Sequence, residues 1–222
     1  MRFTAIAICA AFLLVACATT PKEEPFSVDL DSPNYEVSVI EAYSDRYMSI
    51  GSLKKSNVTV YYYPAEDAVC LQFKIQFADC KQFWDKAGRA AFTAALERYK
   101  EDYEQRKLTK GSKKTARKVY GSTQGFFAWK KTKVGVQAHG SPKIEFGYNI
   151  KDGAAFFTTT QLESYYIDPI GRSRNQTSPV IMLYFTRAQA ESLAALFDQD
   201  HLQGPGRMGS SSADDTDEYM ER

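Results

Sequence analysis

Residues 69–77, with the sequence VCLQFKIQF, form the most regular stretch of this 222-residue chain. From Val69 onward every second residue is a large apolar one, and the residues between them are polar apart from Cys70. This period-two alternation is typical of a β-strand that buries one face and exposes the other. Such strands belong to antiparallel sheets with one covered face, so the stretch predicts a sheet of that kind.

Further strands are expected on both sides, because the neighbouring segments are rich in β-branched and aromatic residues. One of them, residues 180–185, is apolar on both faces and is therefore predicted to lie in the centre of the sheet. Asp152-Gly153 separates two of them and indicates a hairpin turn. The other predicted strands are residues 35–49, 58–63, 126–129, 133–138, 143–150 and 154–166.

Two helices are predicted from capping patterns. Asp79 and Gln82 fit a capping box, and apolar residues at helical spacing continue to Tyr99. A long helix is therefore expected to begin at Asp79. Thr186 and Gln189 fit a second capping box, and the apolar residues that follow them indicate a short helix.

Together these elements predict an α+β domain, in which an antiparallel β-sheet packs on one long and one short helix. A β-sandwich with an inserted helix is the alternative. The chain is expected to divide into an export signal (1–17), a flexible tether (18–34), a single α+β domain (35–202) and a disordered polar tail (203–222). A tether of this length reaches at most about 60 Å when fully extended.

The first 17 residues have the pattern of an export signal. One positive charge, Arg2, precedes an apolar run from Phe3 to Ala16 that only Thr4 interrupts. This run is shorter than the roughly 20 residues that a membrane-spanning helix needs. Small residues close it, so an export signal is expected in place of a membrane span.

The end of this segment, Leu14-Val15-Ala16-Cys17, resembles the lipobox of bacterial lipoproteins. The resemblance implies that Cys17 is acylated on its sulfur and that the peptide before it is removed. It also implies a lipid-anchored protein of the cell membrane or outer membrane that faces the periplasm or the cell exterior. In such proteins an Asp after the cysteine favours the inner membrane, so Ala18 favours the outer one. An ordinary secretory signal with an incidental cysteine is the alternative.

Cysteine usage is simple once the signal is set aside. Cys9 leaves with the signal, which leaves Cys70 and Cys80 as thiols that an exported chain can oxidise. Cys70 is placed near the start of the predicted strand and Cys80 just after its end, more than about 20 Å apart, whereas a disulfide needs Cα atoms within about 7 Å. A Cys70–Cys80 disulfide is therefore not expected, and both thiols are predicted to be free and packed.

Charge and motifs give little support for catalysis. The 28 Lys and Arg nearly balance the 27 Asp and Glu, so the net charge favours neither nucleic acid nor an acidic partner. His139 and His201 have no other ligand at metal-binding spacing, and no hydrolase or nucleotide-binding motif is present. No catalytic residue, metal site or cofactor is predicted.

Two short segments are candidates for binding an anion. Trp129 is followed by lysines that include Lys131, which can combine ring stacking with charge. Arg172 and Arg174 lie in a polar loop, and their guanidinium groups can bind a carboxylate or phosphate. A lysine-protected strand edge and a solvated loop are the alternatives. Nucleic acid is not an expected partner outside the cytoplasm.

These observations predict a lipid-anchored cell-envelope lipoprotein whose domain is a non-enzymatic binding or assembly module. Its partners are expected to be the membrane, through the lipid on Cys17, and an envelope protein, a glycan or a small molecule. The alternatives are an envelope hydrolase of cell-wall or carbohydrate material, and a carrier of a small apolar ligand. A carrier needs a sizeable dry cavity between helix and sheet.

Overall fold

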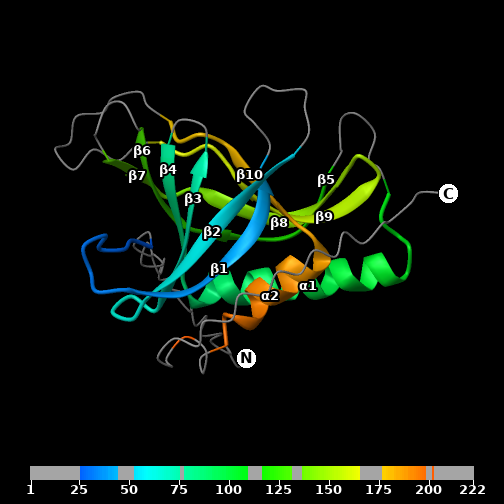
Figure 1. Cartoon of the computed structure of the whole chain (residues 1–222), viewed down its shortest axis with the longest axis horizontal. Helices are drawn as coiled ribbons and strands as arrows, with labels where there is room; N and C mark the ends of the chain where they lie inside the picture. The colour runs from blue at the N-terminus through cyan, green and yellow to red at the C-terminus, as the bar shows by residue number, and fades with distance from the viewer. Residues whose placement is uncertain are drawn as a thin grey trace, which may run out of the picture.

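The structure is a computed structural model that describes residues 26–44, 53–75, 78–109, 117–131, 137–165, 177–198 and 202. Within these ranges, ten strands form one antiparallel sheet and two helices pack against it (Figure 1). The strands in their order across the sheet are β5 (Arg117–Gln124), β8 (Lys143–Lys151), β9 (Ala154–Gln161), β10 (Ile181–Phe185), β1 (Tyr35–Ser44), β2 (Lys54–Tyr63), β3 (Ala68–Ile75), β4 (Ala78–Trp84), β6 (Phe126–Lys131) and β7 (Gln137–Gly140).

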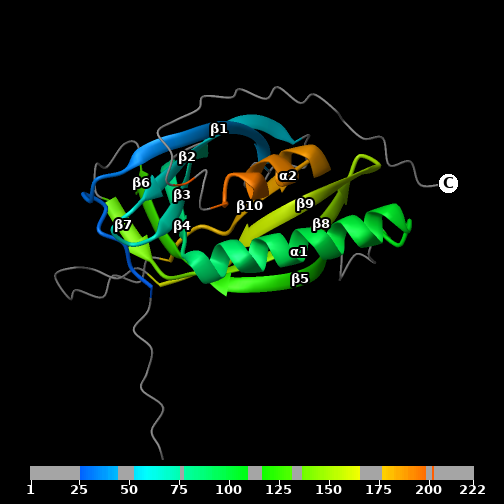
Figure 2. The same ribbon diagram turned by 90° about the horizontal axis from the view of Figure 1, so that it is seen from below.

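The sheet curls into a half-barrel (Figures 1 and 2). Its two ends belong to one continuous ribbon, because β5 runs into β6 across Gly125 alone and β7 runs into β8 across Ser141 and Pro142. The β5–β8 and β6–β7 pairings are the two halves of this ribbon. At this bend a Cβ on Gly125 would displace the end of the Ile144 side chain and lie 3.1 Å from the Phe83 carbonyl oxygen, so the chain packs closely here.

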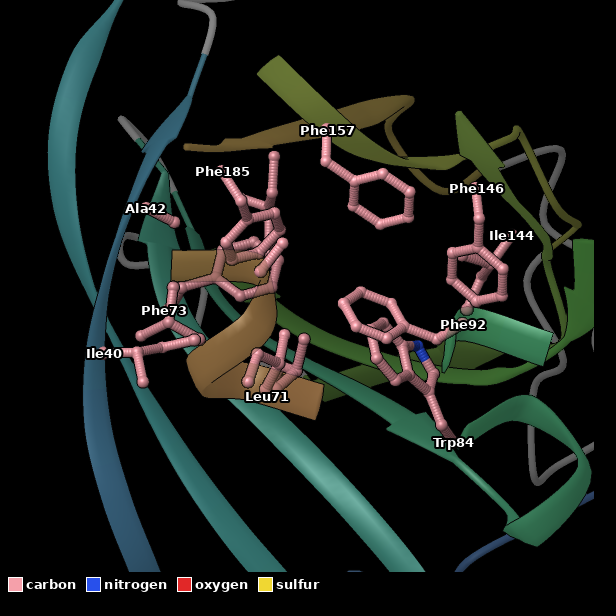
Figure 3. Packing of buried hydrophobic residues seen from close by; sticks show 14 of the residues in the cluster. Ile40, Ala42, Leu71, Phe73, Trp84, Phe92, Ile144, Phe146, Phe157 and Phe185 are labelled. Carbon is pink, nitrogen blue, oxygen red and sulfur yellow. The ribbon is translucent and has the colours of Figure 1, made fainter. Parts of the chain in front are cut away.

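The concave face of the half-barrel holds the main hydrophobic core. Helix α1 (Lys86–Glu104) packs on β5 and β8, and helix α2 (Arg187–Ala195) packs on β1, β10 and β9 (Figure 2). Phe92 of α1 lies at the centre, with ring centroids of Trp84, Phe146 and Phe157 between 5.2 and 5.6 Å away (Figure 3). Phe92 meets Phe146 and Phe157 edge-on and Trp84 at a tilt of 31°, and aromatic contacts of this kind stabilise the centre beyond simple burial.

The long helix begins later than predicted. Its N-cap is Asp85, whose carboxylate accepts a hydrogen bond of 2.7 Å from the Gly88 amide. The capping box expected at Asp79 and Gln82 is wrong, because both residues belong to β4 and pair with β3 and β6. The hydrogen bonds and side-chain contacts that β4 makes with two neighbouring strands stabilise this segment more than a single capping box would.

Other local predictions are confirmed. Thr186 and Gln189 form the second capping box, with hydrogen bonds of 2.9 and 3.3 Å between each side chain and the other residue's amide. Asp152 and Gly153 connect β8 to β9 with φ of 52° and 83°, as an Asp-Gly hairpin turn requires. β10 lies between β9 and β1, inside the sheet as predicted. The α+β class is confirmed, whereas the β-sandwich alternative is wrong, since a single curled sheet carries both helices on its concave side (Figure 2).

The folded body starts before residue 35. Phe26, Val28 and Leu30 pack on the outer face of the sheet, in a second hydrophobic cluster with the buried residues Tyr63, Ala68, Cys70, Phe83, Phe126 and Ala128. The Ser32 hydroxyl also donates a 2.6 Å hydrogen bond to Glu66. Residues 26–34 are therefore part of the domain and not of the tether. The signal, residues 18–25 and the tail from 203 lie outside the described residues.

Candidate binding surface

The four strands β2, β3, β4 and β6 have two different faces, because successive residues of a strand point to opposite sides. On β3, Leu71 and Phe73 are buried in the main core, whereas Cys70, Gln72 and Lys74 face outward. Cys70 is covered by the N-terminal segment, and Lys74 is the most exposed of the three. The outer face is therefore apolar at one end and polar at the other.

The strand register brings the polar residues together. Thr59 pairs with Gln72, which pairs with Lys81 on β4. One row further along, Lys74 pairs with Asp79, which pairs with Lys130 on β6. We refer to this region as the polar shelf, which comprises Lys55, Asn57, Thr59, Gln72, Lys74, Asp79, Lys81 and Lys130.

A shallow groove runs over the β2–β3 part of the polar shelf. It has a volume of about 560 Å³, and its lining includes Lys55, Asn57, Gln72 and Lys74. Lys55 forms an ion pair of 2.8 Å with Glu41 and Lys74 one of 3.4 Å with Asp79. Surface pairs of this kind contribute at most about 1 kcal/mol each, so an incoming anion can compete for the lysines. Amide and hydroxyl groups between them can orient a polar ligand.

The structure changes the role of the first predicted binding residue. Trp129 is only 4% exposed and faces the core, where its ring stacks on Phe127 at 5.2 Å. It is therefore not a surface ligand for an anion. Its neighbour Lys130 points the other way and joins the polar shelf. The backbone of Lys131 lies in β6, opposite Ala78, while its side chain lies outside the described residues, as do Arg172, Arg174 and Cys17.

Sequence reasoning did not single out Lys74 and Lys81 as candidates. The signal for Lys74 was present, because it is one of the polar residues that alternate with the apolar ones in residues 69–77. Lys81 was not recognised as an outward-facing strand residue because the sequence predicts a helix from Asp79 onward. Its place on the polar shelf follows only from the pairing of β4 with β3.

The two thiols are free, buried and on opposite faces of the sheet. Cys80 lies on β4 opposite Phe73, so it is not beyond a strand end as the spacing argument assumed. Cys70 lies on β3 opposite Phe83, with its side chain under the N-terminal segment. Burial raises the pKa of both thiols, that of Cys80 to about 12. Both are therefore protonated and weakly nucleophilic at neutral pH.

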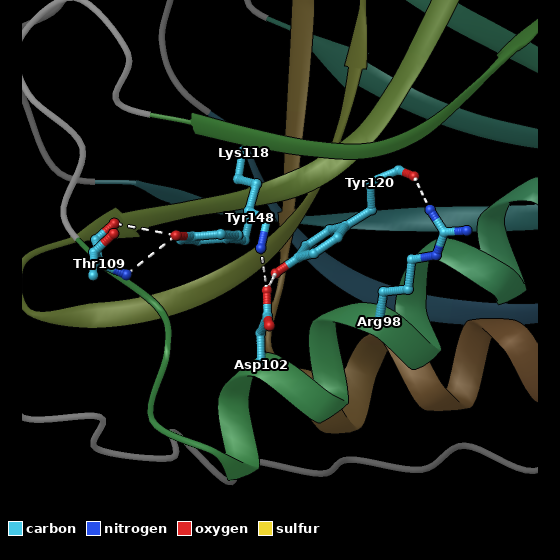
Figure 4. A network of polar contacts seen from close by, with 6 residues as sticks. All are labelled: Arg98, Asp102, Thr109, Lys118, Tyr120 and Tyr148. Carbon is cyan, nitrogen blue, oxygen red and sulfur yellow. Dashed lines mark hydrogen bonds and ion pairs between the residues drawn. The ribbon is translucent and has the colours of Figure 1, made fainter.

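A polar network at the C-terminal end of α1 forms a second cluster of polar side chains (Figure 4). Asp102 accepts hydrogen bonds from Lys118 and from the Tyr120 hydroxyl, the latter at 2.8 Å. The hydrogen bond from Lys118 is the largest cause that lowers the pKa of Asp102. Burial, followed by the hydrogen bond to Asp102, raises the pKa of Tyr120. An ionised carboxylate with two donors is not suited to proton transfer.

This network joins elements instead of forming a reaction site. Arg98 donates to the Tyr120 carbonyl at 3.1 Å, and the Tyr148 hydroxyl contacts both the amide and the carbonyl of Thr109, at 3.1 and 3.2 Å (Figure 4). The contacts fasten the end of α1 and the segment after it to β5 and β8. Among the described residues, no group of three or more His, Cys, Asp or Glu is arranged to hold a metal ion. None of the described helices has the length and apolar character needed to cross a membrane.

The fold and its surface define the class: an α+β half-barrel with an aromatic-filled interior and a polar shelf on its outer face. The chain belongs to the family described as "Uncharacterised Treponema protein", whose model matches residues 27–204. It is 25% identical over 192 residues to an "Uncharacterized protein" of Treponema pallidum (strain Nichols). That alignment covers 86% of this chain and 65% of the relative, so the chain spans about two thirds of the relative's length. No solved structure matches the chain.

Proposed function

We propose that this protein is a lipid-anchored lipoprotein of the cell envelope and that its domain is a non-enzymatic binding or assembly module. The polar shelf is the surface through which it binds. The lipobox-like Leu14-Val15-Ala16-Cys17 supports the anchor. The partner is one of the expected classes: the membrane, an envelope protein, a glycan or a small molecule.

The observation that carries the binding role is the contrast between the interior and the outer face. Phe92 and its aromatic neighbours fill the space that an apolar ligand would need. The polar shelf instead offers exposed lysines beside amide and hydroxyl groups. Exposed groups of this type favour recognition of a polar or anionic surface over burial of an apolar molecule.

Metabolic labelling with a radioactive fatty acid tests the anchor. We expect the wild-type protein to carry the label and a Cys17→Ser variant to carry none, with both proteins folded. The mass of the mature protein should also show that the peptide before Cys17 is removed. Equal absence of label from the wild type and the variant would contradict the proposal.

A further inference from the structure

We propose that the polar shelf lies against an anionic phospholipid surface, with the domain held there by its own short tether. The proposal rests on the lipid anchor proposed above and names the membrane itself as the partner of the polar shelf. Three observations carry it: the length of the tether, the face from which it leaves and the distribution of charge on that face.

The tether is shorter than the sequence alone suggests. Because Phe26 already packs on the domain, only residues 18–25 separate it from Cys17. Such a segment spans about 30 Å when fully extended and about 16 Å as a flexible coil. A domain of this size is roughly 40 Å across. The membrane therefore stays close to the face from which the tether leaves.

That face is the outer face of the sheet. Phe26 and Val28 belong to the cluster that contains Phe83 and Phe126, on β4 and β6. The same two strands carry Lys81 and Lys130 of the polar shelf, on the same face and one or two rows away. The anchor and the polar shelf therefore share one side of the molecule, whereas α1 and α2 lie on the other side of the sheet.

Charge is graded along this face. The lysines Lys55, Lys74, Lys81 and Lys130 outnumber the carboxylates beside them, Glu41 and Asp79. The acidic residues Asp29, Asp31 and Glu36 lie toward the opposite end of the strands, where Ser32 contacts Glu66 and Glu36 pairs with Tyr61. A domain tethered near an anionic surface would turn its basic end toward that surface, because basic residues next to anionic lipids are attracted.

The lysines themselves can report the orientation. The mature chain from Cys17 to Arg222 is coupled through its Cys17 thiol to a maleimide lipid, since the other two thiols are buried. It is placed on vesicles of phosphatidylcholine with or without phosphatidylglycerol, and acetylation of each lysine is followed by mass spectrometry. We expect the polar-shelf lysines to react roughly fivefold or more slowly on the anionic vesicles, and high salt to abolish this protection. Lys100 on α1 and Lys107, three residues after its end, should react equally on both vesicles.

A charge-matched pair of variants controls for net charge. Replacing Lys74, Lys81 and Lys130 by Gln should remove the protection of Lys55, whereas replacing Lys86, Lys100 and Lys107, on and after α1, by Gln should leave it unchanged. Equal rates on the two kinds of vesicle, or equal slowing of polar-shelf and α1 lysines, would overturn the proposal. Protection by a soluble polyanion but not by vesicles would also overturn it, in favour of an acidic polymer. Chemical coupling makes this test independent of acylation in the cell, so it and the fatty acid labelling can fail separately.

Discussion

The guanidinium of Arg89, in the first turns of α1, lies 2.7 Å from the carboxylate of Asp67 in the turn between β2 and β3. It also donates to the Asp67 carbonyl at 2.6 Å, and the Tyr62 hydroxyl donates to the same carboxylate at 2.9 Å. The Arg89 side chain is only 4% exposed. This contact joins the β2–β3 turn to the helix on the concave side of the sheet, and the loss of Asp67 would leave the buried charge of Arg89 unpaired.

We therefore expect Asp67→Asn to lower the free energy of unfolding by about 2 kcal/mol, because asparagine removes the charge that Arg89 needs. Asparagine also tolerates the left-handed backbone at this position, where φ is 45°, so the effect is not one of backbone strain. Asp152→Asn is the matched control, since Asp152 has φ of 52° but lies exposed in a hairpin turn. Urea unfolding at neutral pH measures both, and equal effects of the two variants would contradict the role given to Arg89.

Asp102 should make stability depend on acidity. Its folded-state pKa is lowered, so its contribution is fully present above the unfolded pKa of about 4 and is lost as the pH falls through the lower folded value. Asp102→Asn should thus cost about 1 kcal/mol at neutral pH and nothing in strong acid. Glu101→Gln, an exposed neighbour, should have no effect at either pH. Urea unfolding curves from neutral pH to strong acid test this prediction. A loss of unfolding free energy in Asp102→Asn that does not change with pH would contradict it.

Thiol reactivity should show what the N-terminal segment covers. In the chain from residue 26, neither Cys70 nor Cys80 should react with iodoacetamide at about pH 8, because both thiols are buried and protonated. Removing residues 26–34 should expose Cys70 and leave Cys80 buried under the helices. Mass spectrometry of the alkylated peptides separates the two. Equal reactivity after the deletion, or a disulfide between the two thiols, would contradict the arrangement.

Gly147 is expected to tolerate no side chain. A Cβ at this position would overlap the Lys118 carbonyl oxygen on the paired strand β5, so Gly147→Ala must push the two strands apart. We expect a loss of about 2–3 kcal/mol, typical of overpacking in a close-packed region. Gly121→Ala, on the same strand pair, meets its nearest neighbours at 3.7 Å and should be close to neutral. Thermal unfolding of the two variants compares them directly, and similar melting temperatures would refute the prediction.

Local patterns predicted the elements that depend on local interactions. Residues 69–77 alternate strictly and include most of β3, and Thr186 with Gln189 caps α2 as expected. Asp152-Gly153 likewise forms its turn because the turn is built from those two residues. In each case the energy that selects the structure lies within a few neighbouring positions.

The failures have a common cause, since each depends on pairing between distant strands. Only residues 78–81 alternate between apolar and polar before Gln82 breaks the pattern, so the Asp79 capping pattern predicted a helix, and the pairing with β3 and β6 shows a strand. The burial of Trp129 and the alignment of Gln72 with Lys81 need the register of neighbouring strands. The prolines Pro25 and Pro33 favour a tether for the N-terminal segment, although Phe26, Val28 and Leu30 between them occupy every second position. Its role appears only once Phe83 and Phe126 form a surface on which it packs.

The position of β10 beside β1 has a consequence for how the protein is made. Residues Tyr43 and Ser44 of the first strand find their partners Tyr184 and Leu183 only near the end of the chain. If the chain leaves the cytoplasm unfolded, the backbone groups of β1 that face β10 stay unpaired until most of the polypeptide has crossed the membrane. Such a protein cannot complete its body piecemeal during translocation, so its exposed first strand would rely on chaperones that hold nascent exported chains apart.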